Sequence, residues 1–266
     1  MRKLLIYIYN FMVLNFPECV TIFVLNLFCR LRRNNVHFKR GRNGFIAYDA
    51  RLKLCINFIF INRANLYFSG ILKRFDQLLE QYNIELRCIP ENATFIDCGA
   101  NIGEVGAALN YYRPDLNYIA FEPGAREFNA LTLNLQGKGQ LINSGLWYEN
   151  TDLVFYEKGD TADSSYLEIL DFTNCVTLPV ITLDSLKLSH DNIHLKLEAE
   201  GAEPEVLRGA EDTLDRITAI YADCGFERGI KEETTLPAVV NILISKQFEL
   251  KSATKDRLVL VFRRTL

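Results

Sequence analysis

The strongest constraint on the fold is a change of pattern that follows Pro90. From there on, short apolar runs alternate with stretches whose apolar residues recur at helical spacing. This alternation is typical of βαβ units, in which buried parallel strands are joined by helices. The sequence therefore predicts a Rossmann-like α/β fold with a mostly parallel central sheet. The predicted strands cover residues 94–97, 118–122, 140–143, 193–197 and 219–222.

Two further pairs of strands complete this prediction. Residues 153–156 and 175–180 are expected to form an antiparallel pair inserted between the third and fourth parallel strands. Residues 248–251 and 258–262 flank Asp256 and predict an antiparallel hairpin at a sheet edge.

The first 89 residues follow another pattern. Residues 36–60 alternate between apolar and polar around Arg42-Asn43-Gly44, and Asn-Gly between such runs is a strong hairpin signal. Residues 64–86 carry apolar side chains at helical spacing and predict a helix that ends near Pro90. We therefore divide the chain into an N-terminal appendage, residues 1–89, and a catalytic domain, residues 90–266.

Residues 4–29 are rich in Leu, Ile, Phe and Val, and basic residues follow them at positions 30, 32 and 33. Three interpretations stay open: helices packed on the protein, an anchor on a membrane surface, or a membrane span. Several asparagines and Pro17 interrupt the run and argue against a span. No small-residue cleavage site follows, so a signal peptide fits poorly. Peripheral membrane contact through residues 1–35 is one expectation, with the arginines facing anionic headgroups.

The net charge of −3 and the seven cysteines narrow the class of protein. A nearly balanced charge argues against nucleic acid as a partner. An odd number of cysteines without a C-x-x-C pair indicates a reducing compartment, so we expect a cytoplasmic location, with membrane association as an addition. His190 and His194 straddle a loop and the start of a strand, and we expect no metal site.

An apolar strand that runs into a glycine-containing turn marks the candidate cofactor site. Residues 94–103 read TFIDCGANIG, and a helical stretch, residues 104–112, follows. Gly99 permits a tight turn and the close approach of a ligand, and Gly103 stands where the helix begins to pack on its strand. A dinucleotide fingerprint has three glycines in G-x-G-x-x-G, whereas here two glycines stand four apart. The turn therefore favours a nucleoside without phosphates.

Polar residues at neighbouring strand ends are the candidate contacts to this nucleoside. Glu122 ends the second strand, where a carboxylate can accept hydrogen bonds from both ribose hydroxyls. Asp97 ends the first strand and can reach the amino acid part of the ligand. Asn101 offers donors and an acceptor within the turn, and Asn143 at the end of the third strand joins the set. The alternative is a structural turn that binds nothing.

Charged residues stand at the end of the fourth predicted strand. Because alternate side chains of a strand point the same way, Lys196, Glu198 and Glu200 are expected to share one face. Open α/β sheets bind ligands at this end of their strands. Mutual repulsion of two neighbouring glutamates raises the pKa of one carboxyl, and a lysine lowers the pKa of the other. One acid could therefore take a proton from an acceptor hydroxyl while the other acts as an orienting group. The alternative is a Lys-Glu network that only clamps neighbouring loops.

The fifth strand ends on the same rim. Its Asp223 and Glu227 are candidate contacts to the substrate. Ser164 and Ser165 belong to a polar loop that could cover the site, although a plain surface loop explains them as well.

Four segments together resemble the FkbM-type methyltransferase family: FIDCGANIGE at residues 95–104, IAFEPG at 119–124, ITLDSL at 181–186 and HLKLEAEGAEPEVLRG at 194–209. The resemblance covers about residues 90–262. It implies a class I methyltransferase that uses S-adenosylmethionine and methylates hydroxyls of small molecules, glycans, glycolipids or polyketides. It also implies that the N-terminal appendage recognises the substrate or a membrane.

The resemblance also carries roles for single residues. The implied cofactor contacts are Asp97, Gly99, Asn101, Gly103 and Glu122, and the implied reacting rim is Lys196, Glu198 and Glu200. One position departs from the family, which usually has Asp in its K-x-D-x-E-G pattern where this chain has Glu198. An inactive nucleoside-binding or interaction module is therefore the alternative function. A nicotinamide oxidoreductase is a third interpretation, against which the missing third glycine argues.

Overall fold

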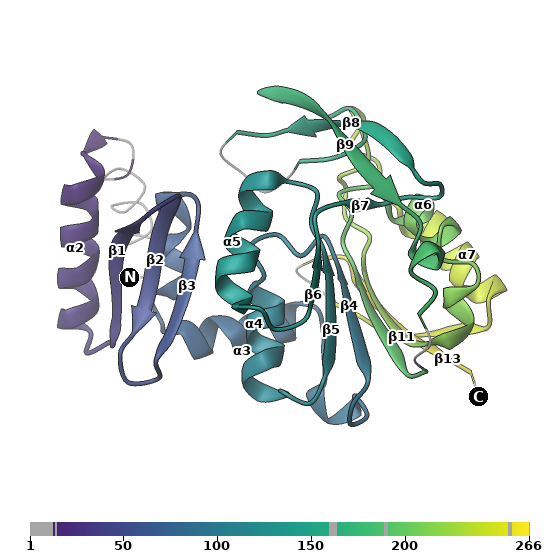
Figure 1. Cartoon of the computed structure of the whole chain (residues 1–266), viewed down its shortest axis with the longest axis horizontal. Helices are drawn as coiled ribbons and strands as arrows, with labels where there is room; N and C mark the ends of the chain where they lie inside the picture. Colours follow the sequence, from purple (N-terminus) through teal and green to yellow (C-terminus); the bar gives the residue numbers. More distant parts are fainter. Residues whose placement is uncertain (1–12, 14, 160–163, 189–190, 255–256, 266) are drawn as a thin grey trace.

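The computed structural model describes residues 13, 15–159, 164–188, 191–254 and 257–265. Its centre is a seven-stranded sheet in the order β12-β13-β11-β10-β4-β5-β6 (Figure 1). Neighbouring strands are parallel except that β13 runs antiparallel to β11 and β12. The predicted fold class, with its C-terminal hairpin, is confirmed. The strands are β4 (Thr94–Cys98), β5 (Asn117–Phe121), β6 (Gln140–Ile142), β10 (Ile193–Leu197), β11 (Ile217–Asp223), β12 (Phe248–Ala253) and β13 (Val259–Arg264).

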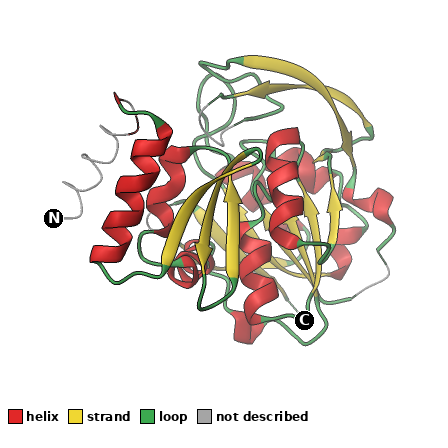
Figure 2. Ribbon diagram, turned by 60° about the vertical axis from the view of Figure 1, so that its left-hand side comes forward, coloured by secondary structure: helices red, strands yellow, loops and turns green. Residues whose placement is uncertain are grey.

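Helices cover both faces of this sheet, which explains why its central strands, β4, β5, β10 and β11, are buried along nearly their whole length. Consecutive residues serve opposite faces: Phe95 belongs to one hydrophobic core and Ile96 to the other. Helices α3, α4 and α5 pack into the first core and α6 and α7 into the second. Figure 2 shows helices on both sides of the strands. The helices are α3 (Ile71–Gln81), α4 (Glu104–Tyr112), α5 (Ala125–Leu135), α6 (Glu203–Arg208) and α7 (Leu236–Ser245).

The inserted antiparallel pair is confirmed, and it belongs to a separate small sheet. Strand β8 (Thr151–Glu157) pairs antiparallel with β9 (Asn174–Ile181). A short strand, β7 (Gly145–Leu146), lies parallel to β9 on its other side. This sheet lies above the central sheet in Figure 1.

The N-terminal appendage contains the predicted hairpin as part of a three-stranded antiparallel sheet. Strands β1 (Val36–Gly41) and β2 (Gly44–Asp49) form the hairpin, and β3 (Leu54–Phe58) pairs with β2. The predicted helix over residues 64–86 is wrong in its bounds. Gly70, with φ of +104°, separates a 3-10 helix (Ile61–Tyr67) from α3, which ends at Gln81. Another 3-10 helix (Leu86–Cys88) precedes the first strand of the central sheet.

The apolar segment 4–29 is described only in its second half, because residues 1–12 and 14 lie outside the described residues. Helix α2 (Glu18–Leu31) begins directly after Pro17 and packs one face against the N-terminal sheet. Among the helices of the described residues, none is long and apolar enough to cross a bilayer. One face of α2 is therefore packed on the protein, and contact of this segment with a membrane surface stays a prediction.

The appendage and the central sheet share one hydrophobic cluster. Phe58 and Tyr67, before residue 90, belong to the same buried cluster as Leu109 and Tyr118, which follow it. The boundary between residues 89 and 90 stays a prediction.

Candidate functional site

A cavity opens at the carboxyl ends of β4, β5 and β10, the edge where parallel sheets bind ligands. Its walls bring together most of the residues predicted from the sequence. Seven of them line it: Gly99, Asn101, Glu122, Lys196, Glu198, Glu200 and Glu227. Asp97, Gly103, Asn143 and Asp223 lie behind these walls.

The turn after β4 lines one side of the cavity. Gly99 has φ of +71°, and a Cβ there would stand 2.0 Å from the carbonyl oxygen of Glu198. Only glycine therefore lets the turn lie against the end of β10. Gly103 stands directly before α4, where the sequence placed the start of a helix, and has a left-handed φ of +80°. A Cβ there would stand 2.5 Å from Leu131 Cδ1 of α5, so Gly103 also lets α4 and α5 approach each other.

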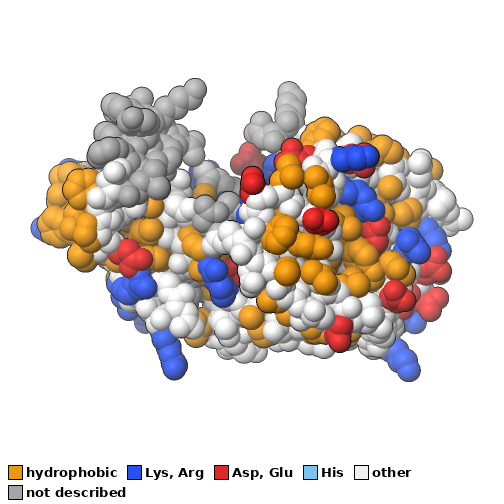
Figure 3. All heavy atoms as spheres, turned by 90° about the horizontal axis from the view of Figure 1, so that it is seen from above, with side chains coloured by type: hydrophobic (Ala, Val, Ile, Leu, Met, Phe, Trp, Pro, Cys, Tyr) orange, Lys and Arg blue, Asp and Glu red, His pale blue; other side chains and the backbone are white. Residues whose placement is uncertain are grey.

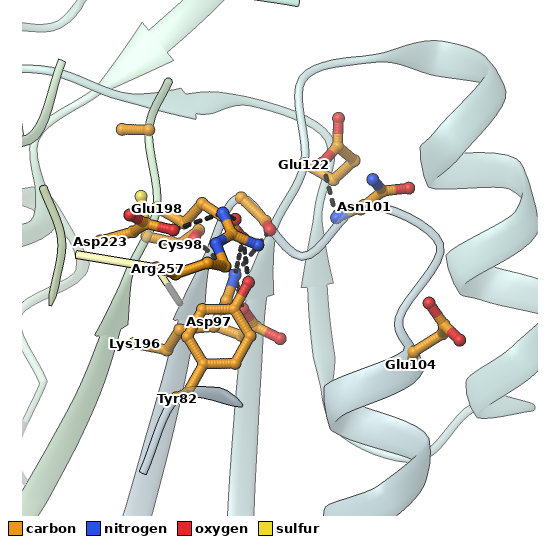
Figure 4. Close-up of polar contacts among 12 residues, drawn as sticks. Tyr82, Asp97, Cys98, Asn101, Glu104, Glu122, Lys196, Glu198, Asp223 and Arg257 are labelled. Carbon is orange, nitrogen blue, oxygen red and sulfur yellow. Dashed lines mark hydrogen bonds and ion pairs between the residues drawn. The ribbon is translucent and has the colours of Figure 1, made fainter. Parts of the chain in front are cut away.

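Glu122 at the end of β5 is buried and held by the backbone. Its two carboxylate oxygens accept the N–H groups of Asn101 at 2.7 Å and Gly124 at 2.8 Å. Figure 4 shows this carboxylate beside the turn of Asn101. Burial raises the pKa of Glu122 to about 8, although the two N–H groups oppose that rise.

Asp97 and Asn143 support this wall from behind and do not contact the cavity. Asp97 is fully buried; it accepts the Tyr118 hydroxyl at 2.6 Å and pairs with Lys196 Nζ at 2.9 Å. Asn143 donates to the carbonyl oxygens of Glu122 at 2.8 Å and Pro123 at 3.0 Å. Asn143 thus fixes the Glu122 loop, whereas Asp97 joins β5 to Lys196 of β10.

Lys196 is the centre of a buried ion network below the cavity. Its Nζ lies 3.0 Å from Glu198 in addition to its pair with Asp97, and it donates to the carbonyl oxygen of Gly99 at 2.8 Å. Burial opposes its charge, but the neighbouring carboxylates raise the pKa of Lys196 well above its ordinary value. A permanently charged, fully paired lysine is suited to holding the two strand ends together.

The expected alternation of charges does not extend to Glu200. Strand β10 ends at Leu197, and Glu200 has a left-handed φ of +48°. The prediction that Lys196, Glu198 and Glu200 share a strand face is therefore wrong for Glu200, although all three line the cavity. Ser165 donates its hydroxyl to the Glu200 carbonyl at 2.8 Å, so the serine loop does cover the site.

Glu198 is bound by three side chains. Besides Lys196, it accepts the Tyr82 hydroxyl at 2.5 Å and an Arg257 N–H at 2.5 Å (Figure 4). Arg257 also pairs with the buried Asp223. Burial alone would raise the pKa of Glu198, but Lys196 and Arg257 lower it to about 2. Glu198 is thus an ionised carboxylate with little capacity to take up a proton near neutral pH.

Glu227 differs from its neighbours because it lines the cavity without a partner. Within the part of the chain that the structure describes, its carboxylate makes neither a hydrogen bond nor an ion pair. Burial, and then the negative charges of Asp223 and Glu198, raise the pKa of Glu227 to about 7. A half-buried, unpaired carboxyl that titrates near neutrality is suited to general base chemistry.

No group of three or more metal-ligating side chains is assembled among the described residues. His194 is buried in β10, where its Nδ1 lies 3.1 Å from the Tyr221 hydroxyl. His190 lies outside the described residues.

Comparison with known proteins assigns the chain to a family. A family model described as the methyltransferase FkbM domain matches residues 97–249, more than half of the chain. This chain belongs to the FkbM methyltransferase family. No curated protein sequence matches it.

Solved structures with low sequence identity resemble the chain in part. An rRNA methylase from Streptococcus thermophilus is 10% identical, with 71% of this chain and 96% of that chain covered at a TM-score of 0.43. The precorrin-6y C5,15-methyltransferase from Geobacter metallireducens GS-15 is also 10% identical. The match covers 73% of this chain and 88% of that chain at a TM-score of 0.43.

Several cavity residues lie outside the segment that matches the FkbM model. Tyr82 follows α3, and Arg257 follows β12. Arg74 of α3 forms a two-point ion pair with Glu104 of α4, both bonds at 2.8 Å, and Tyr67 donates to the same carboxylate at 2.8 Å. No local motif in the sequence marks these residues, because their contacts with the site come from distant parts of the chain. The acid at position 104, directly after the turn, is the one signal, since it needs a cation if it is buried.

Proposed function

We propose that this FkbM-family protein transfers a methyl group from S-adenosylmethionine to a hydroxyl of a small molecule, glycan or glycolipid. One observation carries the proposal: a single cavity has the backbone-held Glu122 on one wall and the unpaired Glu227 on another. Glu122 is placed to accept hydrogen bonds from a ribose, and Glu227 is placed to accept the proton of an acceptor hydroxyl.

The residues of the Glu122 wall fit a nucleoside. Each oxygen of an ionised carboxyl has two acceptor sites. One site on each oxygen is taken by the N–H of Asn101 or Gly124, so each oxygen retains one for a ribose hydroxyl. The absence of a third glycine in the turn argues against a diphosphate at this place.

The acidic wall supplies the proton chemistry. When bound, S-adenosylmethionine offers an electrophilic methyl group on a sulfonium that leaves as a neutral thioether. Glu227 would accept the proton of the acceptor hydroxyl as its oxygen bonds to the methyl carbon. Arg257 pairs with both Glu198 and Asp223, whereas Glu227 beside them has no cationic partner, which favours the proton on Glu227.

The test is transfer of a labelled methyl group from S-adenosylmethionine to a panel of glycans, glycolipids and small hydroxylated metabolites. We expect labelled product that is stable to base, as a methyl ether is and a methyl ester is not. Binding of S-adenosylmethionine without transfer to any acceptor would favour the inactive module. Binding of a nicotinamide dinucleotide in its place would remove the proposal.

A further inference from the structure

Helix α2 lies at one end of the molecule and is fixed to the edge of the N-terminal sheet. Its buried residues are Thr21, Leu25 and Cys29, which recur every four positions and face the sheet. The Asn26 side chain accepts the Phe38 N–H at 2.7 Å and donates to the Phe38 carbonyl at 2.8 Å. These bonds satisfy backbone groups at the free edge of β1, so α2 is firmly attached to the N-terminal sheet.

The opposite face of α2 is apolar as well and faces outward. Val20, Phe23, Leu27 and Leu31 recur at intervals of three and four, and their exposed fractions are 37%, 68%, 45% and 76%. Figure 3 shows hydrophobic side chains gathered over α2 at the left end of the molecule. A surface helix normally turns a polar face to water, so this face has the composition of a contact surface.

Positive charge surrounds this apolar face. Arg30, Arg32 and Arg33 at the end of α2 are all exposed, as is Lys39 on the adjoining β1, and Glu18 at the start of α2 pairs with Arg40. Residues 1–53 contain ten Lys and Arg against two Asp and Glu, a balance of +8. The remaining residues, 54–266, contain 20 against 31, a balance of −11. The nearly neutral chain therefore carries its positive balance in the part of the sequence that contains α2.

We propose that the outer face of α2 docks on the surface of an anionic lipid bilayer. Val20, Phe23, Leu27 and Leu31 would enter the boundary between headgroups and acyl chains, and Arg30, Arg32 and Arg33 would contact lipid phosphates. The helix has 14 residues, which at about 1.5 Å per residue is too short to cross the hydrocarbon core, so it lies in the plane of the surface.

Charge complementarity selects the bilayer over a second copy of the chain. Two α2 faces in contact would bring two strongly positive ends together, whereas an anionic surface attracts the same end. The negative balance of residues 54–266 would repel the rest of the molecule from that surface and orient it with α2 inward.

The experiment is flotation of the full-length chain with vesicles of phosphatidylcholine alone and of phosphatidylcholine with phosphatidylserine, at low salt. We expect flotation with the anionic vesicles only. The triple variant Phe23→Gln/Leu27→Gln/Leu31→Gln should lower the partition coefficient by about tenfold or more. Replacing Arg30, Arg32 and Arg33 by Gln should lower it by about a hundredfold, because each basic residue near the surface is worth about fivefold.

A matched control keeps the test specific. The double variant Ile244→Gln/Leu250→Gln removes exposed apolar side chains, 52% and 46% exposed, that lie on α7 and β12 away from α2, and it should float like the wild type. Circular dichroism and thermal unfolding check that every variant is folded. Wild-type protein that stays unbound on anionic vesicles, or a triple variant that floats unchanged, would overturn the proposal. Dimerisation in sedimentation experiments that the triple variant abolishes, without flotation, would assign the face to a second copy. The assay uses no cofactor, so its outcome is independent of the proposed methyl transfer.

Discussion

The two walls of the cavity hold their carboxylates in different ways. On one wall, Glu122 is bound only by the backbone N–H groups of Asn101 and Gly124. On the other, Glu198 is bound by a lysine, an arginine and a tyrosine hydroxyl. Burial raises the pKa of both carboxyls, but the cations reverse this effect for Glu198, so the pKa of Glu122 is about 8 and that of Glu198 is about 2. Partners, and not burial, therefore decide which acid can exchange a proton.

The largest expected effect comes from removing Glu227, the unpaired acid beside Glu198 and Asp223. Glu227→Gln keeps the shape of the side chain and removes its basicity, so turnover should fall by about two to four orders of magnitude. Affinity for S-adenosylhomocysteine should stay near the wild-type value, because Glu227 is not among the groups that hold Glu122 in place. The wild-type kcat should rise as the pH rises through about 7, where the carboxyl of Glu227 loses its proton, and the variant should lose this dependence.

The matched control for this prediction is Glu211→Gln, which changes an exposed glutamate. Its turnover and pH profile should equal those of the wild type. If Glu227→Gln also retained wild-type turnover while Glu198→Gln lost it without loss of stability, the roles of the two glutamates would be reversed.

The buried ion network predicts a large loss of stability. Lys196→Met leaves Asp97 and Glu198 without their shared cation, and breaking a buried pair typically lowers the free energy of unfolding by about 3 to 5 kcal/mol. Lys251→Met, whose ion pair with Glu249 has both side chains about half exposed, should cost less than about 1 kcal/mol. Urea unfolding followed by the fluorescence of Trp147 compares the two. Equal losses would show that the Lys196 network contributes no more than a surface pair.

A smaller effect is expected on the opposite wall. Glu122→Ala removes the acceptor of two ribose hydroxyls and should weaken S-adenosylhomocysteine binding by about 1 to 3 kcal/mol. Calorimetric titration measures it. Asn143→Ala, which removes only support of the Glu122 loop, should weaken binding less. A Glu122 variant that binds like the wild type would place the nucleoside elsewhere.

The smallest expected effect is on the pH dependence of binding. The ionised form of Glu122 accepts both hydroxyls, so affinity should increase as the pH rises through about 8. If only the ionised form binds, the gain between pH 7 and pH 9 is up to about tenfold. Titrations of S-adenosylhomocysteine at several pH values measure this gain. Glu122→Gln should bind with the same affinity at both pH values, and a wild-type affinity that falls with rising pH would contradict the assignment.

The sequence predicted the Glu122 wall better than the acidic wall because its determinants are local. Gly99, Asn101 and Glu122 follow directly from a strand, a turn and a second strand, and all three line the cavity. Even there, the sequence could not tell which polar residues support the wall, and Asp97 and Asn143 lie behind it.

The acidic wall depends on contacts between distant residues. The partners of Glu198 lie at positions 82, 196 and 257, so strand alternation alone could not show that this carboxyl is neutralised. The predicted alternation also required the strand to continue as far as Glu200, whereas β10 ends at Leu197. The α/β fold was predictable because the apolar periodicity of each segment can be read from that segment alone. The bounds of α3 were not predictable, because Gly70 interrupts the helix although the helical pattern of apolar residues continues through it.

The most direct test of the central claim is a pair of calorimetric titrations on the wild-type chain, one with S-adenosylhomocysteine and one with NADH. Our account predicts that S-adenosylhomocysteine saturates one site per chain and that NADH shows no binding at the same concentrations. Saturable binding of NADH together with no binding of S-adenosylhomocysteine would contradict it.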